Sequence, residues 1–169
     1  MDKKIEKERN IAGGIKDKPT VILYPAKGVE VYTDIGVEKF YLGESITNYK
    51  VWKYEFHPQL MSSTGIPLDF DSYNLEDFLI SLWVDNEVVH TIACDDTCFW
   101  QEKELIGMLY DDFLKVFDIT PDDIDKQWSP GPYKNDRNYD VYTFDDLGLM
   151  LWVWRKRIRQ ILISIPIVD

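Results

Sequence analysis

The sequence predicts an α+β protein: an antiparallel sheet built from two related helix-plus-hairpin units, with the helices packed on one face. Three observations predict this class. β-branched apolar runs that end at turn residues indicate strands, and a segment after residue 100 has the apolar period of a helix. In addition, Tyr73–Cys94 aligns with Tyr142–Ile163 without a gap. The length of 169 residues, 45% of them hydrophobic, suits one core. We expect a single α+β domain over residues 20–169, after a flexible N-terminal arm over residues 1–19.

The first third of this domain begins with strands. Thr20–Tyr24 and Val37–Leu42 are rich in β-branched and aromatic residues, which predicts a strand in each. Ile46–Tyr54 is predicted as a helix, because Ser45 is a good N-cap and apolar side chains recur at helical spacing. The segment His57–Asp71 is punctuated by proline and glycine and is predicted as a loop.

Two β-hairpins are expected, one in each half of the chain. The apolar runs Phe78–Val84 and Glu87–Cys94 flank Asp85-Asn86, a pair typical of a tight hairpin turn. The runs Leu147–Trp154 and Ile158–Ile165 flank a basic tripeptide and form the second hairpin.

The segment between the hairpins is predicted to be helical. Its apolar stripe predicts one amphipathic helix and consists of Leu105, Leu109, Phe113, Val116 and Phe117. The sequence Thr120–Asp123 resembles a second helix start, with a threonine N-cap, a proline at the first helical position and a closing aspartate. Ser129–Pro132 is predicted as a loop.

The alignment of the two halves indicates an internal repeat of about residues 37–94 and 101–165. In what we call the hairpin alignment, the identical pairs are Tyr73/Tyr142, Asp77/Asp146, Leu82/Leu151, Trp83/Trp152, Val84/Val153 and Ile92/Ile161. Upstream, in what we call the loop alignment, Leu42-Gly43 matches Ile106-Gly107 at a slightly smaller separation along the chain. We expect two such units to join their strands side by side, because one unit alone would leave a sheet face bare.

The net charge of the chain limits the kinds of partner that it can bind. The chain carries 30 Asp and Glu against 19 Lys and Arg, a net charge of −11, which disfavours nucleic acid and anionic membranes because both need a cationic surface. A basic protein is the favoured partner. The N-terminus lacks the apolar core of a signal peptide, and no apolar run reaches the roughly 20 residues of a membrane span. We expect a cytoplasmic protein.

The residues that could carry chemistry do not form a recognisable catalytic set. His90 and Cys94 would lie about 13 Å apart on a strand, too far for a dyad. The two cysteines, Cys94 and Cys98, lack the second ligand pair of a structural zinc site. We therefore predict no catalytic residues, cofactor or metal ligands. A divalent-metal enzyme that uses the paired aspartates remains the alternative.

Acidic residues concentrate between residues 95 and 125. This segment contains ten carboxylates and only Lys103 and Lys115 as cations, a net charge of −8. It could imitate a polyanion for a basic partner or be an ordinary solvated face. Tryptophans are frequent interface anchors. The predicted partner-binding residues are Asp95, Asp96, Trp100, Glu102, Glu104, Asp111, Asp112, Asp122, Asp123, Asp125 and Trp128.

The two-fold pattern resembles that of immunity proteins from bacterial contact-dependent growth-inhibition and polymorphic-toxin systems. It is similar, more weakly, to the repeated layout of β-lactamase inhibitory proteins. The resemblance is carried by Tyr73, Leu82-Trp83-Val84 and Ile92 in one unit, and by Leu105–Met108, Tyr142, Leu147–Leu149, Leu151–Val153 and Ile161 in the other. It implies an intracellular protein that is not an enzyme, and we expect a monomer or weak dimer. Such a protein would neutralise a toxin's C-terminal domain, notably a nuclease, by covering its active site or substrate groove. An adaptor or assembly protein is the other alternative.

Overall fold

The computed structural model describes residues 18–58, 70–129 and 137–166. The first five strands are β1 (Thr20–Tyr24), β2 (Gly28–Thr33), β3 (Gly36–Tyr41), β4 (Glu55–His57) and β5 (Asp71–Leu75). They are followed by β6 (Ile80–Asp85), β7 (Val88–Cys94), β8 (Phe99–Trp100), β9 (Lys103–Glu104) and the helix α2 (Tyr110–Phe117). The last strands are β10 (Asp123–Ser129), β11 (Arg137–Phe144), β12 (Leu149–Trp154) and β13 (Arg157–Ser164). Short 3-10 turns are η1 (Ile46–Asn48), η2 (Glu76–Phe78) and η4 (Asp145–Leu147).

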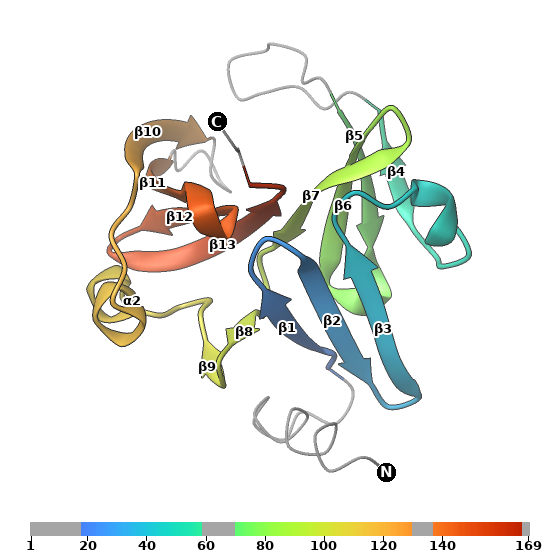
Figure 1. Cartoon of the computed structure of the whole chain (residues 1–169), viewed down its shortest axis with the longest axis horizontal. Coiled ribbons are helices and arrows are strands. Elements are labelled where there is room, and N and C mark those ends of the chain that lie inside the picture. Colours follow the sequence, from blue (N-terminus) through green and yellow to red (C-terminus); the bar gives the residue numbers. More distant parts are fainter. Residues whose placement is uncertain (1–17, 59–69, 130–136, 167–169) are drawn as a thin grey trace.

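The strands form two sheets (Figure 1). The larger sheet has eight antiparallel strands in the order β10-β11-β12-β13-β7-β6-β5-β4. The smaller sheet has the order β3-β2-β1-β8-β9 and is antiparallel except where β1 meets β8. In Figure 1, β10–β13 and β4–β7 form two wings that meet where β13 runs beside β7.

The core lies between the two sheets. Every second residue of β6 and β12 is buried, including Leu82 and Leu151, and the residues between them are half-buried or exposed. The smaller sheet packs Val21, Val31 and Phe40 into the same cluster. The smaller sheet thus covers the apolar face of the larger sheet, which in the predicted fold a layer of helices would cover.

The predicted α+β class is therefore wrong. The protein is mostly β, and α2 is the only α-helix in the part of the chain that the structure describes. Among these same residues, no helix is long and apolar enough to cross a membrane.

Two predicted helices are shorter than expected, one at its end and the other at its beginning. Ile46–Tyr54 contains only η1, although Ser45 caps that turn by accepting a hydrogen bond from Thr47 N–H. The stripe that begins at Leu105 becomes helical only at Tyr110, because the backbone before it forms hydrogen bonds with Cys98 and with Ile158 of β13.

The predicted helix at Thr120–Asp123 is wrong, since Asp123 begins β10. Seven consecutive register pairs join β10 to β11, and these ladder bonds outweigh the local preference for a capped helix. Asp122 accepts a hydrogen bond from Asp145 N–H on η4 instead of capping a helix (2.7 Å).

Several strands match the sequence-based predictions. Thr20–Tyr24 is confirmed residue for residue, and β3 is displaced by one position from the predicted Val37–Leu42. Both hairpins form, with Asn86 and Arg155 among the turn residues of positive φ. The predicted loop after His57 and the predicted loop after Ser129 lie largely outside the described residues.

The loop and hairpin alignments also relate backbone hydrogen bonds in the two halves. Gly43 N–H donates to Val89 O at 2.8 Å. Its counterpart Gly107 N–H donates to Ile158 O, the counterpart of Val89, also at 2.8 Å. In each half the bond anchors the loop that precedes η1 or α2 to the strand of the hairpin nearest the centre.

A pseudo-two-fold axis passes between β7 and β13. Ala93 corresponds to Leu162 in the hairpin alignment, and these two residues pair with each other. The pair of Ile161 with Cys94 on one side of the axis has its counterpart in the pair of Ile163 with Ile92 on the other. The strand order of the larger sheet is accordingly the same read from either edge, with β10 in the place of β4.

Candidate protein-binding surface

The structure divides the predicted partner-binding residues into two groups. The first group surrounds β8 and β9 and comprises Asp95, Asp96, Trp100, Glu102 and Glu104. The second group belongs to α2, β10 and the residue before β10, and comprises Asp111, Asp112, Asp122, Asp123, Asp125 and Trp128. The two groups differ in how far their side chains are engaged within the fold.

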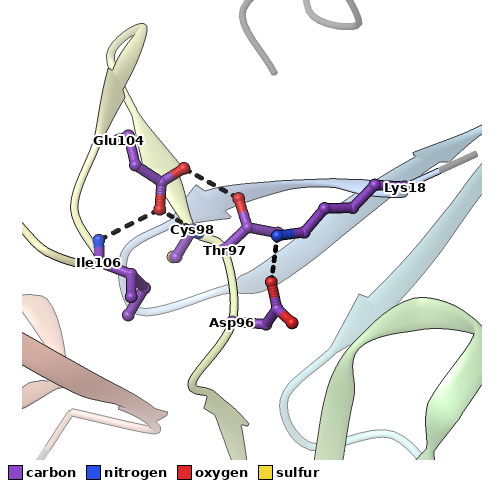
Figure 2. A network of polar contacts seen from close by, with 6 residues as sticks. All are labelled: Lys18, Asp96, Thr97, Cys98, Glu104 and Ile106. Carbon is purple, nitrogen blue, oxygen red and sulfur yellow. Dashed lines mark hydrogen bonds and ion pairs between the residues drawn. The ribbon is translucent and has the colours of Figure 1, made fainter. Parts of the chain in front are cut away.

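Glu104 is the most engaged residue of the first group (Figure 2). Its carboxylate accepts hydrogen bonds from Thr97 Oγ1 (2.8 Å), from Cys98 N–H (3.2 Å) and from Ile106 N–H (3.2 Å). Burial raises the pKa of Glu104, and the hydrogen bonds and Lys18 oppose this rise. The side chain therefore ties the strand segment around β8 to the loop before α2 and is not available to a partner.

The other members of the first group include two that are held by local contacts. Asp96 forms an ion pair with Lys18 (Figure 2). The indole of Trp100 stacks on Phe117 at the end of α2, with ring centroids 4.1 Å apart. Asp95 and Glu102 are exposed at the surface. Glu104, Asp96 and Trp100 thus make contacts within the fold, while Asp95, Asp96 and Glu102 remain exposed.

The second group, together with Ile124, lies on α2, β10 and the segment between them, and we call these seven residues the α2–β10 surface: Asp111, Asp112, Asp122, Asp123, Ile124, Asp125 and Trp128. Tyr110 at the start of α2 stacks on Tyr142 of β11 at 3.8 Å, and Ile124 of β10 pairs in register with Tyr142. Tyr110 of α2 and Ile124 of β10 thus both lie beside Tyr142 of β11. All seven residues of the α2–β10 surface are exposed.

Strand β10 is an edge strand, and its alternation sorts its side chains onto two faces. Asp123 and Asp125 share one face, while Ile124 and Trp128 share the other with 60% and 40% of their surface exposed. An exposed edge of this length is unusual unless it carries charge or is covered. Carboxylates beside apolar side chains are a combination that suits a protein partner.

The electrostatics of this region are dominated by carboxylates. Residues 110–129 contain six aspartates and only Lys115 and Lys126 as cations. Lys126 is paired with Asp140 on β11 at 2.8 Å, and this hydrogen bond raises the pKa of its ammonium group. Burial raises the pKa of Tyr142, and nearby Asp140 adds to the rise. The surface therefore presents an uncompensated negative field.

Ile124 is the member of this surface that the sequence prediction omitted. The sequence DIDKQW alternates acidic or polar residues with Ile124, Lys126 and Trp128, a period of two that is typical of a strand. This signal is present in the sequence, but Thr120 and Pro121 favour the interpretation as a helix start.

The described residues include no group of three or more His, Cys, Asp or Glu placed to hold a metal ion. Cys94 and Cys98 are both buried free thiols, and the hydrogen bond between Cys98 and Cys94 together with burial raises the pKa of Cys98. Burial lowers the pKa of His90, which lies on β7 and hydrogen-bonds with Thr91 (2.8 Å).

Comparison with protein-family models, with curated protein sequences and with solved structures gives no match.

Proposed function

We propose that this protein binds and neutralises a basic protein through the α2–β10 surface. The observation that carries the proposal is the arrangement of β10, an edge strand with exposed carboxylates on one face and two exposed apolar side chains on the other. Opposite charge steers the partners together and favours the correct orientation, and desolvation of Ile124 and Trp128 would supply affinity.

The partner class within this proposal is a toxin domain that acts on nucleic acid. A domain that holds phosphates needs a cationic groove, and six aspartates on α2, β10 and the segment between them could occupy such a groove. The resemblance to immunity proteins supports this choice over an adaptor role. A metal-dependent enzyme has less support, because the exposed aspartates serve the binding proposal without any added ion.

The proposal is tested by capture of the tagged chain's partner from its native host at low and high salt. We expect a basic protein at near one-to-one ratio, with binding that weakens as salt rises. Expressed alone, the captured protein should arrest growth, and co-expression of this chain should restore growth. A captured protein that does not affect growth would contradict neutralisation and favour the adaptor role.

A matched pair of triple variants locates the surface. Asp111→Asn, Asp112→Asn and Asp123→Asn remove three carboxylates without loss of volume, and we expect them to weaken capture by about tenfold or more. The control removes three exposed carboxylates elsewhere: Asp34→Asn, Asp85→Asn and Glu87→Gln. Equal loss of capture in the control would attribute binding to net charge and not to this surface.

A further inference from the structure

The larger sheet carries a second feature, on the face opposite the core and within the C-terminal unit. A cavity of about 440 Å³ opens there, with Arg137 and Tyr139 of β11, Trp152 of β12 and Gln160 of β13 in its lining. This volume falls in the range of small-molecule sites, roughly 300–1,000 Å³.

A β-bulge turns the cationic side chains toward this cavity. Trp152 pairs with Gln160 and Val153 pairs with Ile158, so that Arg159 is an extra residue on β13. A bulge of this kind sets two successive side chains on one side of the strand and re-aims them. Arg159 and Gln160 consequently both line the cavity beside Trp152.

Three arginines gather beside this cavity on the ring of Trp154. The guanidinium carbons of Arg137, Arg155 and Arg159 lie 4.2, 4.4 and 5.5 Å from the ring centroid. The ring attracts each cation, but the like charges repel one another. In the described ranges, none of the three arginines forms an ion pair with a carboxylate. Among the described residues, three cations thus gather in an acidic chain without an ion-paired carboxylate.

The cavity also contains donors without acceptors. Arg137 Nε and Trp152 Nε1 are buried and have no hydrogen-bond partner among the described residues. Buried donors normally have a partner, so these two donors indicate a position where an acceptor would bind. Asp95 also lines the cavity. Its carboxylate would repel an anion of high charge more strongly than an anion of low charge.

The N-terminal unit provides an internal comparison for the same backbone. It has the same bulge, with His90 as the extra residue beside Trp83. There Phe70 stacks on Trp83 at 4.5 Å and contacts His90 at 5.4 Å, so that aromatic rings fill the position. Because this unit forms the hairpin and its bulge with a histidine at that position, the fold itself does not require the arginines.

We infer that the Arg137–Arg159 cavity binds a small organic oxyanion, a carboxylate or a phosphate monoester. The planar fork of arginine matches both groups through paired hydrogen bonds. The indole N–H of Trp152 and the amide of Gln160 can complete the donor set, and the ring of Tyr139, 5.4 Å from that of Trp152, adds an aromatic wall. This site is independent of the α2–β10 surface.

The experiment uses phenyl phosphate, inorganic phosphate and benzoate as probes, with phenol as the uncharged control and sodium chloride at matched ionic strength. The readouts are the unfolding midpoint, which a ligand of the folded state must raise, and the Trp152 indole resonance, assigned with Trp152→Phe. We expect at least one oxyanion to raise the midpoint and to shift this resonance, whereas phenol and sodium chloride do neither. Binding of the phosphates alone, or of benzoate alone, identifies the group that is recognised.

Variants separate this site from general charge effects. Arg137→Gln and Arg159→Gln should each weaken binding by about tenfold or more, as expected for the loss of a charged hydrogen bond. Arg159→Lys, which keeps the charge but not the fork, should also weaken it. Lys156→Gln in the adjacent turn is the matched control and should stay within about twofold. An unmoved Trp152 resonance with all three oxyanions, or equal loss in the control, overturns the inference.

Discussion

Glu104 illustrates why a residue's type alone does not reveal its role. In the sequence it is one of ten carboxylates in an acidic segment, yet in the fold it accepts three hydrogen bonds from Thr97, Cys98 and Ile106. Two of these donors are backbone N–H groups, and a buried N–H group without an acceptor is costly. The shape of this side chain and its acceptor oxygens therefore matter more here than its charge.

Substitution of Glu104 tests this interpretation. Glu104→Ala should lower the free energy of unfolding by about 2–5 kcal/mol, because it leaves two N–H groups without acceptors. Glu104→Gln should cost about 1 kcal/mol or less, since the amide oxygen can accept both N–H bonds and the amide nitrogen can donate to Thr97. Urea denaturation measures both values, and a similar cost for the two variants would contradict the account.

The pH dependence of the same residue has a definite sign. Burial raises the pKa of Glu104 in the folded state, so the folded protein holds this proton more tightly than the unfolded chain does. The contribution is fully present below the ordinary glutamate pKa and is lost as pH rises through the raised pKa. Relative to Glu104→Gln, the wild-type chain should therefore lose stability across that range, as measured by urea denaturation at successive pH values. An unchanged difference would oppose the assignment.

Gly148 and Leu79 occupy equivalent left-handed positions after η4 and η2, with φ of 62° and 58°. A Cβ on Gly148 would lie 2.0 Å from the carbonyl oxygen of Ser164. Gly148→Ala should therefore destabilise the protein by about 2–4 kcal/mol, more than the roughly 1 kcal/mol of left-handed strain alone. Leu79→Gly should change stability by about 1 kcal/mol or less, because relief of strain offsets lost packing. Thermal unfolding compares the two variants, and an equal effect of both would contradict the close approach at Gly148.

At the scale of elements, local signals and long-range pairing differ in what they reveal. Strand β1 and both hairpins could be predicted because β-branched runs and turn residues lie next to one another in the chain. Strand β10 could not, because Thr120–Asp123 has the local chemistry of a helix start, whereas the bonds that decide its structure go to β11. Similarly, the apolar stripe after residue 100 predicts α2 but not its first residue.

The candidate sites follow the same division. The carboxylates of the α2–β10 surface lie close together in the sequence and could be predicted, whereas Asp96 and Glu104, which the same reasoning assigns to a partner, instead make contacts within the fold. The arginine cavity could not be predicted, because Arg137 and Arg159 come from β11 and β13 and meet only through the sheet. In the sequence alone, Arg159 is one member of a basic cluster at a hairpin turn.

Substitutions on β10 and α2 should distinguish exposed residues that are free to contact a partner from buried residues that stabilise the fold. Ile124→Ser and Trp128→Ser should each change stability by about 1 kcal/mol or less, because both side chains are exposed. Phe113→Ala should cost about 3–5 kcal/mol, since this ring is fully buried among Trp100, Phe117 and other aromatic side chains. Denaturant unfolding gives all three values. A large loss for Ile124→Ser would mean that β10 supports the fold, not a partner.

For the whole molecule, the eight-stranded sheet joins the two units into one hydrogen-bonded body. Strands β7 and β13 pair at the centre, and the core cluster includes residues from both units and from the smaller sheet. A shared sheet and core favour a single cooperative unfolding transition. Tryptophan fluorescence and far-ultraviolet circular dichroism should therefore give coincident unfolding curves. Two separate transitions would show that the units unfold independently.

The equivalent residues Ile92 and Ile161 provide a symmetric test of this coupling. Both are fully buried and flank the central seam. Ile92→Ala and Ile161→Ala should each lower the free energy of unfolding by about 2–5 kcal/mol, and neither should split the transition. A cost confined to one of the two positions would mean that the units do not contribute equally to the core.

The pairing of Ala93 with Leu162 has an evolutionary consequence. A shorter ancestral chain that held one unit would place this residue opposite its own copy, which is the contact that a two-fold homodimer makes. Fusion of two such genes would keep the β7–β13 pairing. The two halves of the fused chain could then acquire different residues at equivalent positions. A small alanine could then face a large leucine, and one half could fill its bulge with aromatic rings while the other gathered arginines.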